Sequence, residues 1–299
     1  MDISTWTLTE EDYRQGTLAV ARAADGAQVV LGGHAHLGLL TGYFDKQSST
    51  LIGESYWGLT DVSKVDLEFD DATGKFTGAS VRLVPLWTDR TGEDARVTET
   101  IKDFSGTVNT EMDKAVGESE ADLPFNETGL DSAIGDWMTD AMRRQAGADM
   151  AFQNTAGIRS DLKKGPIKMR DIYQVMPFEN TAVKLKLTGA QIMKLLKDNF
   201  RNGRTKLQIS GLTVKFRLPA EGKTGDLAIE KDGKAINPSD EFTVVTNNYL
   251  TTGGSGGRTF SEGKDMQDTM QPIRELLIKD IRENSPVKMP VLGRFVKLD

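Results

Sequence analysis

The first third of the chain alternates apolar and polar positions in a way that predicts one helix followed by strands. Thr7 with Glu10 three positions later forms a capping box that opens a helix over residues 9–24. The continuously apolar run at residues 28–31 predicts a short strand buried on both faces of a sheet. Three more strands are predicted at residues 50–54, 63–69 and 79–85, the last after a DDATGK turn.

The second half mixes helical and strand periodicity. A strongly amphipathic helix is predicted where apolar residues recur at i, i+3, i+4, i+7 and i+8: Ile134, Trp137, Met138, Ala141 and Met142. Residues 183–187 alternate as a half-buried strand, and Thr188 with Gln191 caps the helix that follows. Further strands are predicted at residues 214–218 and 242–246, and a last helix at residues 272–281. Helices and strands without regular βαβ spacing predict an α+β fold.

Residues 96–118 are polar with helical spacing and carry no turn signal before Gly117, which predicts a connecting helix. The predicted organisation is therefore a first domain over residues 1–95, a linker helix over 96–118 and a second domain over 119–299. A chain of 299 residues with 38% hydrophobic content is long enough for two such cores.

Composition excludes several classes of protein. A net charge of −7 argues against binding of a nucleic-acid polymer, which needs a surplus of Lys and Arg to displace counterions. The sequence has no run of about 18 apolar residues, so no membrane span is predicted, and the N-terminus has no signal-peptide pattern. The absence of cysteine excludes disulfides, thiolate metal sites and cysteine nucleophiles. The chemistry of the chain therefore depends on oxygen and imidazole groups.

The only two histidines, His34 and His36, follow the 28–31 strand in the motif GGHAH. Glycines at the end of a strand let two imidazoles leave the backbone close together, which suits a metal ion. A single H-x-H pair also occurs by chance on surfaces, and a metal needs three or more ligands. Metal ligands and surface histidines both remain open from the residues alone.

Three segments combine amides and glycines with an aromatic ring or an arginine. They are NTAGIR (Asn154, Gly157, Arg159), MPFEN (Phe178, Asn180) and NNYLTTGGSG (Tyr249, Gly253, Gly254, Ser255). Two rings from separate loops can sandwich a flat base, and an arginine fork suits phosphate or carboxylate. The alternative is that the phenylalanine is core and the glycines are only turns.

Taken together, these motifs resemble the 5′-nucleotidase family, the group that includes UDP-sugar hydrolases and 2′,3′-cyclic phosphodiesterases. NTAGIR resembles the family's N-x-G-G-I-R, MPFEN its P-F-x-N, and NNYLTTGGSG its N-x-F-x-x-x-G-G-D-G, while QISGL resembles a strand motif. GGHAH resembles the final G-G-H-[ST]-H of the metallophosphatase domain. The resemblance implies a complete C-terminal substrate domain preceded by the closing part of a metallophosphatase sheet.

The resemblance also implies roles for residues. Phe178 and Tyr249 would clamp a nucleobase, Asn180 would bind its edge, and Arg159 would contact the charged or ribose part of a small nucleotide-like ligand. His34 and His36 would ligate divalent metal ions such as Mn²⁺ or Zn²⁺. Two departures put the substrate in doubt, because Ser255 replaces the usual aspartate and Thr128 lies near the place of a usual arginine.

The family's earlier metal-binding motifs have no counterpart here, so the expected metal site is incomplete and the chain is expected to be truncated. Two imidazoles on one turn cannot hold the two ions of a phosphoesterase centre. We expect self-association, or a second chain that supplies the missing half of the site. The strand at 28–31 is expected to present an edge for pairing with such a partner. Family members are commonly exported, which predicts a periplasmic or extracellular location.

Two functions besides metal-dependent hydrolysis of nucleotide phosphate esters remain open. One is a non-catalytic module that binds a nucleotide. The other is a serine esterase that uses Ser255, because Gly253 to Gly257 matches the G-x-S-x-G nucleophile elbow. No histidine follows Ser255 in the sequence to act as its base, which weighs against the esterase.

Overall fold

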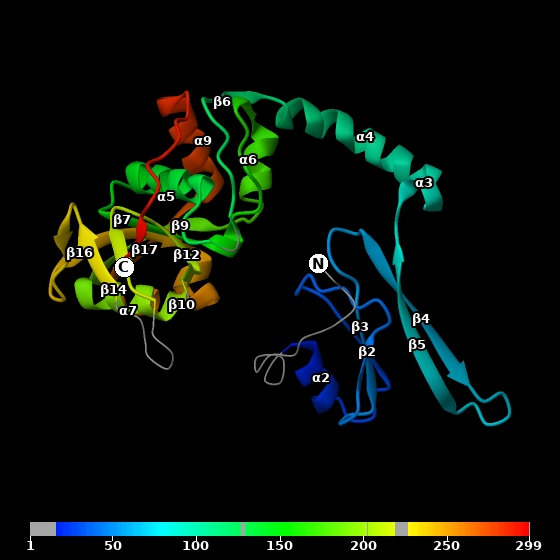
Figure 1. The fold of residues 1–299 in the computed structure, drawn as a ribbon. Coiled ribbons are helices and arrows are strands. Elements are labelled where there is room, and N and C mark those ends of the chain that lie inside the picture. Colours follow the sequence, from blue (N-terminus) through cyan, green and yellow to red (C-terminus); the bar gives the residue numbers. More distant parts are fainter. Residues whose placement is uncertain (1–15, 127–128, 202, 219–226, 299) are drawn as a thin grey trace. The chain divides into compact units, whose positions relative to one another are not determined.

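The computed structural model describes residues 16–126, 129–201, 203–218 and 227–298 (Figure 1). The chain divides into two compact units, Met1–Asp103 and Phe104–Asp299. The predicted capping box at Thr7 and Glu10 and the position of Thr128 lie outside the described residues. The α+β fold class is confirmed by the mixture of sheets and helices in both units.

The N-terminal unit is built on a small three-stranded sheet, ordered β1-β3-β2, in which β1 runs parallel to β3. Its elements are α2 (Thr17–Ala23), β1 (Val29–Gly32), β2 (Tyr43–Asp45), β3 (Thr50–Glu54), β4 (Asp61–Phe69), β5 (Phe76–Pro85) and α3 (Thr88–Thr91). β4 and β5 form a long hairpin, drawn in cyan in Figure 1. The small core of the N-terminal unit consists of Leu18, Ala21, Leu39 and Ile52.

The four strands predicted in this unit are confirmed, with ends that differ from the prediction by at most three residues. The prediction that the strand at 28–31 is buried on both faces is wrong, because Leu31 is 58% exposed and β1 pairs with β3 alone among the described strands. A continuous apolar run signals burial only where neighbouring elements cover both faces, and only α2 and β3 pack on β1 to any extent.

The connecting helix α4 (Ala95–Met112) begins where the sequence predicts but ends six residues before residue 118. The remainder of the predicted helix forms strand β6 (Ala115–Ser119), which pairs with β8 (Gly165–Lys168). Gly117 packs so closely against the last helix of the chain that a Cβ added to it would lie 2.4 Å from Cγ2 of Ile281. Packing against the last helix therefore overrides the local helical pattern.

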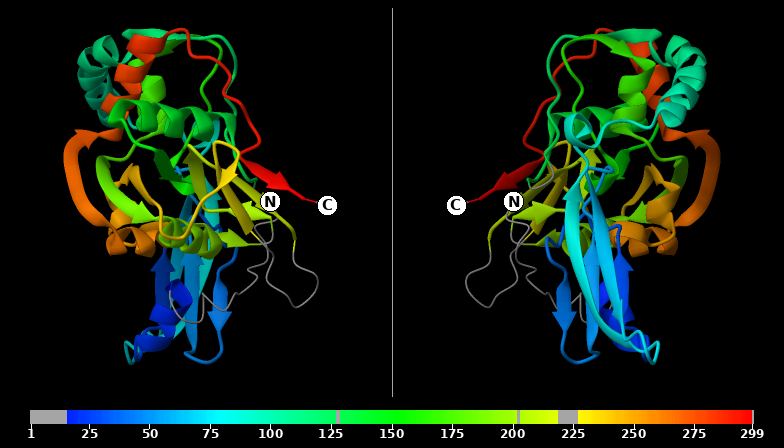
Figure 2. Two further views of the ribbon diagram at one scale, coloured as in Figure 1. Left: turned by 90° about the vertical axis from the view of Figure 1, so that its left-hand side faces the viewer. Right: turned by 90° about the vertical axis from the view of Figure 1, so that its right-hand side faces the viewer.

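The C-terminal unit is organised around a five-stranded mixed sheet ordered β12-β7-β16-β9-β17 (Figures 1 and 2). Strands β7 and β16 are parallel, and the other neighbours are antiparallel. The sheet strands are β7 (Met150–Asn154), β9 (Thr181–Thr188), β12 (Leu207–Ser210), β16 (Glu241–Asn247) and β17 (Lys264–Pro272). The helices are α5 (Ala133–Ala146), η1 (Thr155–Gly157), α6 (Met169–Val175), α7 (Gly189–Asn199), α8 (Asn248–Thr251), η2 (Gly254–Glu262) and α9 (Ile273–Asn284).

Besides the β6–β8 pair, two smaller sheets belong to this unit. Strands β10 (Phe200–Arg201) and β11 (Arg204–Thr205) form a short hairpin. A four-stranded sheet ordered β15-β14-β13-β18 consists of β13 (Thr213–Phe216), β14 (Leu227–Lys231), β15 (Lys234–Ala235) and β18 (Phe295–Lys297).

The central sheet buries both of its faces, which follows from the alternation of side chains along its strands. Ala151 and Val245 face the core shared with α5 and α9, whereas Phe152 and Val244 face the core shared with α7. The predicted amphipathic helix is confirmed as α5, with its apolar stripe buried. The capping box of Thr188 and Gln191 is confirmed at the start of α7. This two-sided core fixes the sheet on which the candidate site is mounted.

Candidate functional site

One edge of the central sheet gathers all three predicted binding motifs. Parallel strands β7 and β16 end there with Asn154 and Asn247, and antiparallel β9 begins there directly after Asn180. Because the carboxyl ends of parallel strands meet at one edge, motifs far apart in sequence become neighbours. We call this the Asn154 edge.

A network of buried amides ties these strand ends together. Nδ2 of Asn247 donates to Oε1 of Gln153 at 2.8 Å and to Oδ1 of Asn154 at 2.9 Å. Oδ1 of Asn247 accepts from the backbone N–H of Leu250 at 2.8 Å and so caps α8, the helix that carries Tyr249. Buried amides that satisfy one another give the edge a single arrangement.

Tyr249 stands on α8 with 46% of its surface exposed. Its ring lies directly against Gly254, where an added Cβ would be 2.4 Å from Cζ of the ring. The preceding residue of the helix, Asn248, accepts a hydrogen bond from Nδ2 of Asn180 at 2.9 Å. The structure thus brings three of the predicted binding residues together on adjacent segments.

Phe178 is 43% exposed and lies in the loop between α6 and β9. Arg274, at the start of α9 and 5% exposed, braces that loop. Its Nη1 donates to the carbonyl oxygens of Met176 at 3.2 Å and Phe178 at 2.9 Å, and its Nη2 pairs with Glu179. Phe178 is therefore not a core residue, and its ring keeps surface available for stacking.

The NTAGIR motif forms the turn that leaves β7. Gly157 is buried, and a Cβ there would approach Gln153 Nε2 to 2.6 Å and Asn154 Nδ2 to 2.8 Å, so the amide network requires glycine. Arg159 is exposed, and its Nη1 donates to the carbonyl oxygen of Ala156 at 3.2 Å. The rest of its guanidinium is available to a ligand.

A cavity of about 370 Å³ opens beside this turn, lined by Thr155, Ala156, Thr205, Lys206 and Ser255. Ser255 has φ 44°, in the left-handed region, between Gly253 at 94° and Gly256 at 83°. β16 ends at Asn247 and α8 intervenes before Ser255, so the strand–turn–helix geometry of a nucleophile elbow is not formed. This finding weighs against the serine esterase.

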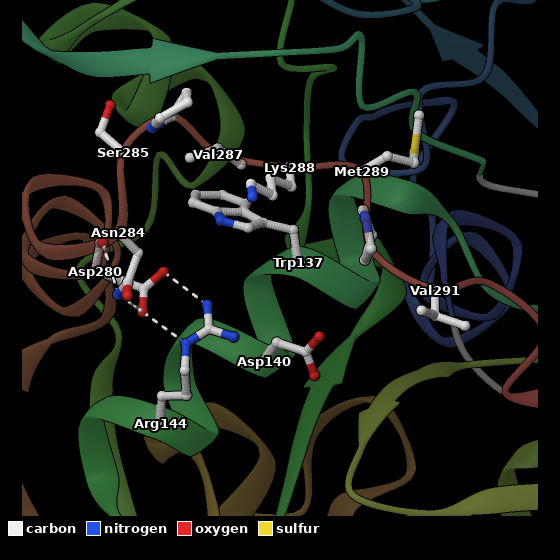
Figure 3. A pocket seen from close by; sticks show the side chains of 12 residues that line it. Trp137, Asp140, Arg144, Asp280, Asn284, Ser285, Val287, Lys288, Met289 and Val291 are labelled. Atoms are coloured by element: carbon white, nitrogen blue, oxygen red, sulfur yellow. Dashed lines mark hydrogen bonds and ion pairs between the residues drawn. The ribbon is translucent and has the colours of Figure 1, made fainter.

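A larger cavity of about 610 Å³ lies between residues 137–144 of α5 and the C-terminal part of α9 (Figure 3). Its lining comprises Trp137 and Arg144 of α5, Asp280 and Asn284 of α9, and the segment that follows α9. Arg144 pairs with Asp280 through two hydrogen bonds of 3.0 and 2.9 Å, so these charges satisfy each other. None of the sequence-predicted site residues lines this cavity.

The predicted metal ligands lie in the N-terminal unit. His34 and His36 are exposed, with φ of 71° and 55°, and the ring of His36 stacks on Trp57 at a centroid distance of 5.7 Å. The described residues contain no group of three or more His, Asp or Glu side chains placed to hold an ion. A dinuclear centre needs more ligands than this pair offers, so the described residues do not fit one.

The predicted site residues do not include several that shape the Asn154 edge, although two of them lie inside the NNYLTTGGSG motif: Gln153, Asn247, Asn248 and Arg274. Asn247 had a local signal, because asparagine before a short helix is a favoured cap. Arg274 had no such local signal, because an arginine in the first turn of an amphipathic helix is usually expected to be exposed to solvent.

The C-terminal unit is an α+β domain whose mixed sheet carries amides, an arginine and two half-exposed rings at one edge. The model of the 5′-nucleotidase C-terminal domain family matches residues 110–262, more than half of the chain, and the chain belongs to this family.

Full-length relatives extend the similarity beyond that domain. The chain is 27% identical over 298 residues to the trifunctional nucleotide phosphoesterase protein YfkN of Bacillus subtilis, covering 93% of this chain and 20% of that protein. It is 22% identical over 272 residues to the protein UshA of Escherichia coli, covering 83% of this chain and 48% of that protein. The chain thus spans a fifth to a half of the length of these relatives.

Among solved structures, the 5′-nucleotidase precursor of Thermus thermophilus matches with a TM-score of 0.68 and 26% identity over 91% of this chain and 59% of that one. A 5′-nucleotidase of Staphylococcus aureus matches with a TM-score of 0.72 at 18% identity over 99% and 60%, which shows the fold alone. Within the described part of the chain, no helix is both long and apolar enough to cross a bilayer.

Proposed function

We propose that this protein serves in the hydrolysis of phosphate esters of nucleotides or nucleotide-like compounds, with the Asn154 edge as the substrate-binding site. The observation that carries the proposal is the placement of Phe178 on a braced loop and of Tyr249 on a capped short helix at that edge, each about half exposed. A flat base stacks between such rings, and Asn180 and Arg159 bind its edge and the ribose or a charged group. The names of relatives such as YfkN support the choice of substrate.

The hydrolytic step requires groups beyond His34 and His36. These two imidazoles are the only candidates for divalent-ion ligands on their turn, and they do not by themselves hold two ions. We propose that a second copy, or another chain that pairs with the edge of β1, supplies the remaining ligands. Sedimentation velocity tests this, since a monomer that hydrolyses nucleotides at micromolar concentration would exclude it.

The binding proposal is tested with the full chain and adenosine, adenosine 5′-monophosphate and uridine 5′-monophosphate in isothermal titration calorimetry. Phe178→Ala and Tyr249→Ala are expected to raise the Kd roughly tenfold each, because stacking contributes about 1–3 kcal/mol per base. Phe44→Ala, at a 55% exposed ring of the N-terminal unit, is the matched control and leaves the Kd unchanged. Equal affinity in all three variants would exclude the Asn154 edge as the site.

A second candidate is a non-catalytic nucleotide-binding module. The specific observation in its favour is the lack of a three-ligand metal cluster among the described residues. Phosphate release from nucleotides, measured with and without added Mn²⁺ or Zn²⁺, distinguishes the two. Binding without any release favours the module, and release that depends on an added ion favours the hydrolase.

We propose a location outside the cytoplasm. A relative that is 28% identical over 283 residues, covering 87% of this chain and 35% of that protein, is named a cell wall protein of Listeria monocytogenes. Fractionation of cells that express the protein, followed by immunodetection, tests the location, and recovery with the cytoplasmic fraction would contradict it.

A further inference from the structure

The cavity beside the NTAGIR turn has a basic wall without an acidic counterpart. Its lining residues include one cation, Lys206, three hydroxyl residues and an alanine, and no carboxylate. The side chains of Lys206 and Ser255 make no hydrogen bond or ion pair with any residue in the described ranges. A lysine and a hydroxyl that line the same cavity can both donate to an anion.

More positive charge lies next to this wall. In the short hairpin that precedes Lys206, Arg201 and Arg204 are directly opposite each other, and both are exposed. Neither forms an ion pair with a described residue. Like charges at opposed positions of a hairpin destabilise it, so an anionic ligand would relieve a cost that the fold carries in its absence. This accumulation is notable in a chain with a net charge of −7.

The cavity is held in shape by hydrogen bonds of its own frame. The backbone N–H of Thr155 donates to the carbonyl oxygen of Lys206 at 2.9 Å, and that of Lys206 donates to the carbonyl oxygen of Asn199 at 3.1 Å. Nδ2 of Asn199, which is 3% exposed, donates to the carbonyl oxygen of Gly256 at 3.1 Å. Asn199 therefore links the wall formed by Lys206 to the loop that carries Ser255, and a ligand meets a site already formed.

The position of the cavity relates it to the stacked base. Ser255 follows Gly254, the residue that lies against the Tyr249 ring. Because Gly254 and Ser255 are consecutive and Ser255 lines the cavity, a ligand whose base stacks on that ring has the cavity wall beside it. The lining has no carboxylate or imidazole to activate water or hold a metal ion, so a phosphate bound there is held rather than hydrolysed.

We propose that this cavity is an anchoring subsite for a phosphate on the ribose, separate from the phosphate ester that reacts. The ligand class is a nucleotide with phosphates at two ribose positions, such as a nucleoside 3′,5′-bisphosphate. Lys206 and the hydroxyl of Ser255 donate to the second phosphate, and Arg204 adds to the local positive potential. The inference rests on the proposed function, because it takes the base to be stacked on Tyr249.

Calorimetry with the full chain tests the proposal with adenosine, adenosine 5′-monophosphate, adenosine 3′,5′-bisphosphate and inorganic phosphate. The bisphosphate is expected to bind about tenfold more tightly than the 5′-monophosphate, as charge-assisted hydrogen bonds imply. Lys206→Ala should remove most of this preference and leave the affinity for adenosine unchanged, and Ser255→Asp, which places a negative charge in the cavity, should abolish the preference. Lys234→Ala, at an exposed lysine of β15 on the separate four-stranded sheet, is the matched control and retains the preference.

The outcomes separate the subsite from the proposed function. If adenosine and its 5′-monophosphate bind but the second phosphate adds less than twofold, the subsite is excluded and the proposed function stands. If inorganic phosphate binds as tightly as the bisphosphate, and its binding depends on Lys206, the cavity binds a free anion. The proposal that the bound phosphate belongs to a nucleotide is then wrong. If no nucleoside or nucleotide binds, both ideas fail.

Discussion

Arg274 and Phe178 are joined by a hydrogen bond of 2.9 Å from Nη1 of the arginine to the carbonyl oxygen of the phenylalanine. The two residues are 96 positions apart, and the arginine comes from the first turn of α9. The same guanidinium lies over the ring of Tyr173 at 4.2 Å from its centroid and pairs with Glu179. One buried cation thus fixes the loop that presents a candidate stacking ring.

Replacing Arg274 should loosen that loop and weaken ligand binding. Arg274→Ala leaves two carbonyl oxygens without their donor, so we expect a loss of about 2–4 kcal/mol in the free energy of unfolding, measured by urea denaturation. Arg274→Lys keeps the charge but not the forked pair of donors, so its loss in the free energy of unfolding should be intermediate. Arg282→Ala, an exposed residue of the same helix, should change stability by less than about 0.5 kcal/mol. A nucleotide Kd that stays unchanged in Arg274→Lys would show that the brace has no part in binding.

Gly254 should be required for the position of the Tyr249 ring. A Cβ at residue 254 would lie 2.4 to 2.6 Å from three atoms of that ring, so Gly254→Ala must push the ring aside. We expect a nucleotide Kd at least about fivefold higher, since misplaced stacking loses about 1 kcal/mol or more. Gly106→Ala, where an added Cβ meets nothing within 4 Å, is the control and should bind normally. Fluorescence titration or calorimetry measures the effect, and normal binding by Gly254→Ala would argue against stacking on Tyr249.

Local signals in the sequence were sufficient for much of the framework. The apolar stripe from Ile134 to Met142 and the capping box at Thr188 each determine their own helix, because the interactions concerned lie within one or two turns. Strand β3 begins and ends where its pattern predicts. These elements depend on near neighbours alone, which is why periodicity finds them.

Features that depend on distant partners were not predictable. β6 replaces the end of a predicted helix because residues 165–168 pair with it, and Leu31 is exposed because nothing described covers that side of β1. The motifs around Phe178 and Tyr249 indicated a site, yet the amide network of Gln153, Asn154 and Asn247 emerges only when β7 and β16 lie side by side. Sequence identifies residue types at the site, whereas the sheet determines which of them touch.

A buried carboxyl in α5 should make stability depend on pH. Burial raises the pKa of Asp136 from 3.8 to about 8, opposed by the nearby charge of Arg294, whose Nε lies 3.3 Å from Oδ1. Asp131 and Asp140 face the same position and raise its pKa further. Between about pH 4 and pH 8 the native state keeps a proton that the unfolded state releases, so stability falls as pH rises.

The predicted slope from Asp136 is up to about 1.4 kcal/mol per pH unit, measured as the free energy of unfolding in urea from pH 5 to pH 8. Asp136→Asn cannot release a proton and should flatten this part of the profile. Asp89→Asn, at an exposed acid of α3, should leave the slope unaltered. An identical slope in Asp136→Asn and the unaltered protein would mean that Asp136 is ionised throughout the range.

The turn that carries His34 and His36 should not by itself hold a pair of divalent ions. The ring of His36 already stacks on Trp57, and no third ligand from the described residues is grouped with the two imidazoles. We therefore expect the chain alone to bind Mn²⁺ or Zn²⁺ weakly and with less than two ions per chain after gel filtration, measured by mass spectrometry of the eluted metal. His34→Ala combined with His36→Ala should lower the residual content, whereas Asp89→Ala should not. If two ions per chain were retained and were lost in the double variant, other residues of this chain or a second copy of it would complete the metal centre. Hydrolysis would then not require a different protein to supply the missing ligands.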